Sequence, residues 1–273
     1  MVGTLAGKTV VVTGSTRGIG RAIARACGRE GATLVVNGRT EIAVDRAVEE
    51  LRASGVKATG VAADVSKPDG AKRIYEFAIA RHTGIDVWFN NAGLPGGFRP
   101  LDELTPEELL RIVDVNLGGT MLGCRLVVPY MREHGGVIVN LCGRGSNGEV
   151  AAFGATYAAT KSGIASLTRS LASENRDAAR LTICGLLPGM VPTAFYEEMD
   201  VSPKLADKVG NVHVALDAFG ATLDEVGTFA AALAAQTPGT ATGKIHSVIT
   251  PTRRIRGVLK LLRARMTGRM TPL

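Results

Sequence analysis

The chain has 273 residues, of which 45% are hydrophobic and 34 are glycine, a composition typical of a well-buried globular protein with many tight turns. Its formal net charge of +7 comes from 32 basic and 25 acidic residues, and seven of the basic residues but none of the acidic ones lie in 251–273. The rest of the chain is neutral, so we expect no nucleic-acid binding by the body.

The N-terminal sequence predicts no targeting segment. It has no basic stretch followed by an apolar run and a cleavage site. From the sequence, no apolar run is expected to be long enough to span a bilayer. We therefore expect a cytoplasmic protein. The four cysteines and four histidines are scattered without the spacing of metal ligands, which predicts buried thiols and no metal site.

Short apolar segments rich in β-branched residues recur through the first 190 residues, each bounded by glycine or polar turns. They are too short for helices and too uniformly apolar for strands with one wet face, which predicts parallel strands covered on both sides. The predicted strands are 9–14, 33–38, 57–65, 86–93, 136–143 and 180–189. Amphipathic segments between them predict helices at 19–31, 41–55, 67–84 and 105–135, the last beginning at Thr105 before Pro106. This alternation predicts an α/β fold: a Rossmann-type doubly wound parallel sheet with helices on both faces, in a single domain.

A glycine-rich loop, "TGSTRGIG" at 13–20, follows the first predicted strand and opens the first helix. Glycines in this context let the chain turn sharply and bring backbone N–H groups and a helix N-terminus against a pyrophosphate. The predicted nucleotide contacts in the loop are Gly14, Ser15, Thr16, Arg17, Gly18, Ile19 and Gly20.

The end of the second predicted strand, "NGRT", indicates which nucleotide is bound. An acidic residue at this point bonds the adenosine ribose 2′-hydroxyl, whereas a cation accommodates a 2′-phosphate. Gly38 stands at the place of the acid and Arg39 follows it, while Arg17 offers a second guanidinium. We expect NADP(H) to be preferred, with NAD(H) as the other option; alternatively, both arginines are solvated surface charges.

Tyr157 and Lys161 are four residues apart in "YAATK", which places them on one face of a predicted helix. A free phenol with a pKa of roughly 10 holds its proton at neutral pH, but a nearby ammonium favours the phenolate and lowers that pKa. The pair is therefore a candidate general acid or base. Such pairs also occur as plain surface pairs, and here the glycine loop favours the catalytic interpretation.

The motifs "TGSTRGIG", "ADV", "NNAG", "VNL", "YAATK" and "PGMVPT" occur in this order over about residues 5–250. In this the chain resembles the classical branch of the short-chain dehydrogenase/reductase family. The resemblance implies hydride transfer between a nicotinamide and a small-molecule ketone, aldehyde or alcohol, with Tyr157 exchanging the proton. It also implies a homodimer or homotetramer.

The resemblance implies further site residues. Asp64 and Val65 would border the adenine, Lys161 would also hold the nicotinamide ribose, and Asn116 would hold the water of a proton relay. The remaining implied nucleotide contacts are Asn90, Ala92, Gly93, Pro188, Gly189, Val191 and Thr193. Several of these residues have a plain alternative: the asparagines as turn or helix-kink residues, and Asp64 and Thr193 as caps.

A serine that members of this family carry before the tyrosine helix has no counterpart here. Alignment on "VIVNL" places Gly143 at that position, and counting back from Tyr157 places Arg144 there. Ser146, the nearest hydroxyl, could take the role; a backbone N–H of Gly143 or Arg144, or a water, could replace it. A third alternative is a catalytically weak or silent NADP(H)-binding protein that acts through a partner.

We expect residues 1–250 to form the catalytic domain, with a substrate-covering lid at about 194–222. Apolar lid residues could line a substrate pocket or pack the lid onto the body: Phe195, Tyr196, Met199, Val212, Val214, Leu216 and Phe219. A helix at 222–236 and a last strand at 241–249 follow.

The segment 251–273 predicts a basic amphipathic extension. On a helical wheel one apolar stripe adjoins a face with Arg256, Lys260 and Arg263. Such a helix could lie on an anionic membrane, enter a partner's groove, or dock on the body or a neighbouring subunit. The stripe comprises Ile255, Val258, Leu259, Leu262 and Met266.

Overall fold

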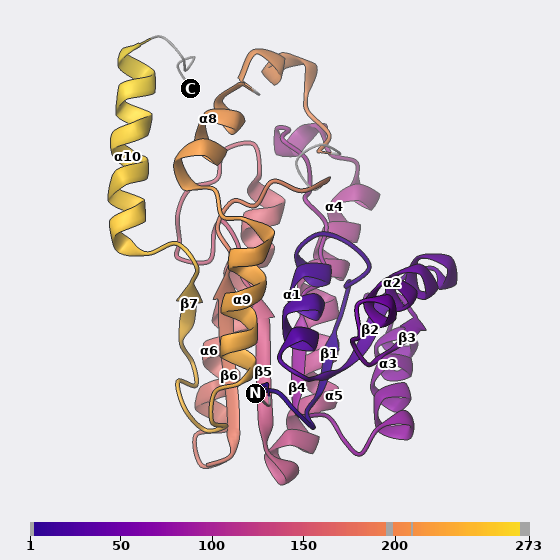
Figure 1. Ribbon diagram of the computed structural model, residues 1–273. Helices are drawn as coiled ribbons and strands as arrows, with labels where there is room; N and C mark the ends of the chain where they lie inside the picture. The colour runs from indigo at the N-terminus through magenta and orange to yellow at the C-terminus, as the bar shows by residue number, and fades with distance from the viewer. Residues whose placement is uncertain (1–2, 195–198, 209, 268–273) are drawn as a thin grey trace.

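The computed structural model describes residues 3–194, 199–208 and 210–267 (Figure 1). Seven strands form one parallel sheet in the order β3-β2-β1-β4-β5-β6-β7. The strands are β1 (Thr9–Val12), β2 (Thr33–Gly38), β3 (Ala58–Ala62), β4 (Val87–Asn90), β5 (Gly136–Leu141), β6 (Leu181–Leu187) and β7 (Ile245–Ser247). The chain order reverses between β1 and β4, and ligands of such sheets bind at the carboxyl ends of the strands beside this point.

Helices cover both faces of the sheet, as predicted (Figure 1). They are α1 (Gly18–Arg29), α2 (Glu41–Ala53), α3 (Pro68–Arg81), α4 (Pro106–Val113), α5 (Gly119–His134), α6 (Ala155–Glu174), α8 (Gly210–Phe219), α9 (Leu223–Ala234) and α10 (Pro251–Met266), with the shorter turns η1 (Leu101–Glu103), η2 (Asp114–Gly118) and η3 (Pro203–Lys208). The predicted Rossmann-type architecture is confirmed.

Alternate residues of each strand enter two different cores. Val10 and Val12 of β1 pack with α1, α2 and α9, whereas Val11 packs with α3, α5 and the far end of α6. This two-sided burial explains why the strands are uniformly apolar.

The four cysteines are free and buried, and burial raises the pKa of the Cys27 and Cys184 thiols to about 12.

The predicted helix at 105–135 is interrupted. Thr105 begins α4 with a capping box: its side chain accepts from the Glu108 N–H, and the Glu108 carboxylate accepts from the Thr105 N–H. The π-helical turn η2 then separates α4 from α5.

By length and composition Pro106–His134 could cross a membrane, contrary to the expectation from the sequence. Half of its apolar window is buried inside the structure, which makes it weak evidence for a span.

Candidate active site

The glycine loop turns tightly at the carboxyl end of β1. Gly14 and Gly18 have φ angles of 61° and 56°, which side chains disfavour. A Cβ on Gly14 would lie 2.8 Å from the Ala92 Cα, so this glycine lets the loop touch the end of β4. Helix α1 begins at Gly18 without a side-chain cap, which leaves the N–H groups of its first turn available to an anion. The loop thus fits the phosphates of a dinucleotide.

Not every predicted loop residue can contact a nucleotide through its side chain. Ser15 is fully buried, and its hydroxyl donates to the Val12 carbonyl at 2.7 Å and accepts from the Asn37 N–H at 3.1 Å. The Thr16 methyl lies over Gly38, and Ile19 packs against the apolar cluster around Val191. The Ser15 side chain therefore positions the loop, whereas Thr16 and Ile19 are partly exposed and their predicted contacts with a nucleotide stay predictions.

Two asparagines that the sequence analysis did not single out hold the loop in place. The Asn37 carboxamide oxygen accepts from the Gly14 N–H at 3.2 Å, and its Nδ2 donates to the Val61 and Ala63 carbonyls. Asn91 Nδ2 donates to the Thr13 carbonyl at 2.8 Å. A lone asparagine closing an apolar strand was the only signal of Asn37 in the sequence.

Arg39 is exposed directly after β2, where the second strand was predicted to select the nucleotide. A Cβ on the neighbouring Gly38 would lie 2.5 Å from the Thr16 methyl carbon, so a side chain at this position would have to displace Thr16. Burial raises the pKa of Asp64, but the Ser66 N–H and hydroxyl, with Arg111 and Arg39, outweigh it and lower the pKa overall. The charge of Arg39 thus helps to stabilise the ionised form of Asp64.

The side chain of Asn90 does not line the nucleotide cleft, which corrects the prediction. It is buried, with Oδ1 accepting from Trp88 Nε1 at 2.7 Å and Nδ2 donating to Asn140 Oδ1 at 2.8 Å. Asn140 is its register partner on β5, so the pair satisfies polar groups inside the core. Ala92 is partly buried and Gly93 exposed at the same strand end, as a cleft requires. Val65 is largely buried against Gly119.

Asn116 lies in the π-helical turn η2 and is fully buried. Its Oδ1 accepts from the Leu94 N–H at 2.7 Å, and its Nδ2 donates to the Leu94 carbonyl at 3.0 Å and to Thr160 Oγ1 at 3.2 Å. Both amide hydrogens are used, so a relay water at Asn116 would have to donate to an oxygen lone pair. Asn116 thus connects the loop after β4, through Leu94, to α6, through Thr160.

Tyr157 and Lys161 lie one turn apart on α6, as predicted, with Lys161 Nζ 5.6 Å from the centroid of the Tyr157 ring. Lys161 is buried and donates to the Leu141 carbonyl at 2.8 Å. Desolvation lowers the pKa of Lys161 to about 8, although the nearby Cys142 acts in the opposite direction. The phenol thus has beside it a cation that can lose its proton in the physiological range.

Gly143, one of the two positions considered for the missing serine, lies against the tyrosine. A Cβ on Gly143 would lie 2.6 Å from Tyr157 Oη and 3.1 Å from Lys161 Cγ, so the tyrosine hydroxyl sits over the bare Cα. Of the two positions considered from the sequence, Gly143 is therefore shown to lie against the phenol. A side chain at this position would push against the phenol.

Ser146 does not face Tyr157 in place of that serine. Its buried hydroxyl accepts from the Gly143 N–H at 3.0 Å and donates its single proton to the Lys161 carbonyl at 3.1 Å. The Gly143 N–H is likewise used. The Arg144 N–H has no hydrogen-bond partner within the part of the chain that the structure describes.

The segment after β6 passes beside the glycine loop. A Cβ on Gly18 would lie 4.0 Å from the Thr193 methyl carbon, and Gly189 with a φ of 81° packs closely on Ile249. The Val191 side chain is buried among Ala221, Val226 and Ile249, so only its backbone could meet a carboxamide. Pro188, Gly189, Val191 and Thr193 thus lie between the end of β6 and the glycine loop, and their contacts with a cofactor stay predictions.

The start of the lid is fastened to the loop after β4, a contact not predicted from the sequence. The Phe98 N–H donates to the Asp200 carbonyl at 2.7 Å and the Ser202 N–H to the Phe98 carbonyl at 3.1 Å. Arg99 pairs with Asp200 and with Glu108 at 2.7 Å. The predicted lid residues Phe195 and Tyr196 and the Val212 side chain lie outside the described part of the chain.

Contacts across the carboxyl edge bring these groups into one neighbourhood: Gly14 meets Ala92, Gly93 meets Asn116, Asn116 meets Thr160, and Gly143 meets Tyr157. A phenol, a buried amine and an anion-binding loop meet there. Such a site can bind a phosphorylated nucleotide and exchange a proton with a small molecule.

Comparison with known proteins agrees with this arrangement. The family model for short chain dehydrogenases matches residues 8–203. The chain is 38% identical over 205 residues to 3beta-hydroxysteroid dehydrogenase 1 of Eggerthella lenta, covering 73% of this chain and 77% of that protein. It is 36% identical over 205 residues to an Arabidopsis thaliana protein named probable chlorophyll(ide) b reductase NYC1, covering 68% of this chain but only 41% of that protein.

Among solved structures, a Beutenbergia cavernae protein assigned as an NAD(P)-dependent gluconate 5-dehydrogenase, with bound NADP, superposes with a TM-score of 0.78 at 32% identity. The match covers 89% of this chain and 96% of that one. The family-model match over residues 8–203, with these identities and coverages, shows that the chain belongs to the short-chain dehydrogenase/reductase family of oxidoreductases.

Proposed function

We propose that this chain is an NADP(H)-dependent oxidoreductase that interconverts a ketone or aldehyde and the corresponding alcohol. The observation that carries the proposal is the Tyr157 hydroxyl lying over Gly143 with buried Lys161 beside it. The glycine loop and the uncapped start of α1 would hold the phosphates, and Arg39 would hold a 2′-phosphate. The similar Beutenbergia cavernae protein with bound NADP supports this cofactor.

A bound nicotinamide would supply or accept the hydride at the substrate carbon. The chain's own residues handle the proton. Tyr157 gives a proton to the carbonyl oxygen in reduction and takes one from the alcohol in oxidation. Protonated Lys161 favours the phenolate, and its pKa of about 8 makes it a proton donor or acceptor near neutral pH.

The substrate oxygen would meet no hydroxyl at position 143, and the Ser146 proton is used elsewhere. Loss of one such donor typically costs about 10²- to 10³-fold in rate. We therefore propose that Tyr157 acts with less help than in relatives that carry the serine. The Arg144 N–H is the remaining candidate donor in this loop.

The test is turnover of NADPH by the purified protein on a broad panel of ketones and aldehydes. Tyr157→Phe should lose about 10²- to 10⁴-fold in rate while still binding NADPH. Tyr75→Phe is the matched control, because Tyr75 lies on α3 and packs edge-on against Tyr130. Equal turnover by wild type and Tyr157→Phe would remove the assigned acid, and NADPH binding without turnover of any carbonyl would instead support the silent binding protein.

A further inference from the structure

Helix α10 stands at the edge of the molecule beside α8 (Figure 1). Thr250 caps it by accepting from the Arg253 N–H at 3.3 Å, and Pro251 takes its first position. The helix is therefore preformed, so a partner would not have to fold it on binding.

The side of α10 that faces the body is made of small residues. A Cβ on Gly257 would lie 2.3 Å from Phe219 Cε1 of α8, and Ala264 is buried two turns later. Lys260 adds a hydrogen bond to the Asp217 carbonyl at 3.1 Å. These contacts fix which way the helix is rotated.

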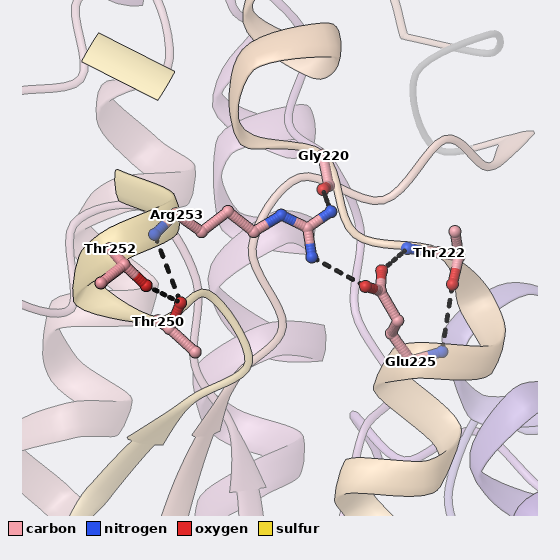
Figure 2. Close-up of polar contacts among 6 residues, drawn as sticks. All are labelled: Gly220, Thr222, Glu225, Thr250, Thr252 and Arg253. Carbon is pink, nitrogen blue, oxygen red and sulfur yellow. Dashed lines mark hydrogen bonds and ion pairs between the residues drawn. The ribbon is translucent and has the colours of Figure 1, made fainter. Parts of the chain in front are cut away.

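Arg253 ties the start of α10 to the start of α9 (Figure 2). Its guanidinium donates to Glu225 at 2.8 Å and to the Gly220 carbonyl. Glu225 is itself the carboxylate of the α9 capping box, accepting from the Thr222 N–H at 2.7 Å. Contacts with α8 and with the start of α9 thus fix the orientation of α10.

The predicted apolar stripe points the opposite way. At about 100° per residue, the stripe is centred roughly 180° around the helix from Gly257 and Ala264. Its five residues are all exposed, from 50% for Val258 to 87% for Met266. The helix therefore docks on the body, one alternative from the sequence, but it does so through its small-residue side, and the stripe is left exposed.

Cations border the stripe on both sides. By the same helical geometry, Arg254 and Arg265 flank one edge and Arg256 and Arg263 the other. None of Arg256, Arg263 and Arg265 has an ion-pair partner among residues 3–194, 199–208 and 210–267, and 251–273 holds no acidic residue. An apolar centre with cations on both edges matches an interfacial helix that buries its stripe among acyl chains while arginines reach anionic headgroups.

We propose that α10 is a peripheral membrane-binding helix that docks this chain on an anionic lipid surface. Charge complementarity selects this occupant over a second copy of the chain, because pairing two stripes would bring two sets of arginines together without a carboxylate between them. The proposal is independent of the cofactor and of the reaction.

The experiment is sedimentation of the full chain with vesicles of phosphatidylcholine alone or with about 30 mol% phosphatidylglycerol, at low and high salt. Wild type should bind the anionic vesicles at low salt and be released by salt. Leu259→Glu with Leu262→Glu should abolish binding, and Arg256→Gln with Arg263→Gln should weaken it about 25-fold, at about fivefold per cation. Ile42→Glu is the matched control, since Ile42 is 84% exposed on α2, and it should bind like wild type.

A second measurement reports insertion directly. Leu262→Trp adds a fluorophore on the stripe, while Trp88, the only natural tryptophan, is 1% exposed. The fluorescence emission of the Leu262→Trp variant should shift to the blue when anionic vesicles are added and should not shift with phosphatidylcholine vesicles. Wild type that stays in the supernatant at low salt, or glutamate variants that still bind, would overturn the proposal. A third result would also overturn it: wild type is an oligomer that does not bind vesicles, and the stripe variants are monomers. The stripe would then be an interface between copies of the chain.

Discussion

Lys161→Met should stabilise the protein at neutral pH, although Lys161 belongs to the proposed catalytic machinery. In wild type, folding transfers the ammonium from water into a buried site where its pKa falls from 10.5 to about 8. At about 1.4 kcal/mol per pH unit, this difference means that burial of the charge costs roughly 3 kcal/mol below pH 8. Methionine has a similar length and carries no charge.

The substitution also removes the hydrogen bond to the Leu141 carbonyl, a loss of roughly 1 to 2 kcal/mol. We therefore expect a net gain of roughly 1 to 2 kcal/mol in the free energy of unfolding at pH 7. The sign changes with pH. Because the folded-state pKa lies below the unfolded one, the wild-type penalty is complete below about pH 8 and is relieved as pH rises toward 10.5.

Urea unfolding of both proteins at about pH 7, 9 and 10.5 measures this difference. The advantage of the methionine variant should shrink with pH and reverse near the upper end. Lys57→Met, at an exposed lysine, should differ from wild type by a small amount at every pH. A difference between wild type and Lys161→Met that stays constant with pH would refute a buried ammonium at this position.

Substitutions at three further positions test other parts of the structure. Gly143→Ala should lower kcat, because its Cβ would lie 2.6 Å from Tyr157 Oη. Gly143→Ser should recover part of this loss, because it adds a hydroxyl. Equal kcat values for the alanine and serine variants would count against a missing hydrogen-bond donor. Arg39→Gln should raise the Kd of NADPH about 10- to 100-fold in calorimetry and leave that of NADH nearly unchanged; equal effects on both would refute 2′-phosphate recognition. Gly257→Val should separate α10 from Phe219 and speed hydrogen exchange in 251–267; unchanged exchange would refute that packing.

The architecture was predictable because it follows from local patterns. Uniformly apolar strands such as Thr9–Val12 predict burial on both sides, and the structure places helices on both faces of the sheet. The Thr105 cap was visible because its donors and acceptors lie within four residues. The π-helical turn at Asn116 was not visible in the residue spacing, and the Asn116 side chain bonds to Leu94 on another segment.

Side-chain orientation in the candidate site was less predictable for the same reason. Asn90 stands in a motif that implies a cleft residue, yet its partner across the sheet, Asn140, draws the carboxamide into the core. Ser146 looked like the nearest available hydroxyl, but its proton goes to the Lys161 carbonyl, 15 positions away in the chain. The expected assembly, the localisation and the catalytic roles stay predictions.

Two glycines matter for the position of the missing serine and for the orientation of α10. In a sequence, glycine usually indicates a turn, whereas Gly143 and Gly257 matter here for the side chain they lack. At Gly143 the vacant space receives the Tyr157 hydroxyl, and at Gly257 it receives the Phe219 ring. The first approach fixes where the phenol lies in the proposed active site, and the second turns the apolar stripe of α10 outward. Because each partner lies on another helix, neither consequence could be derived from residue spacing.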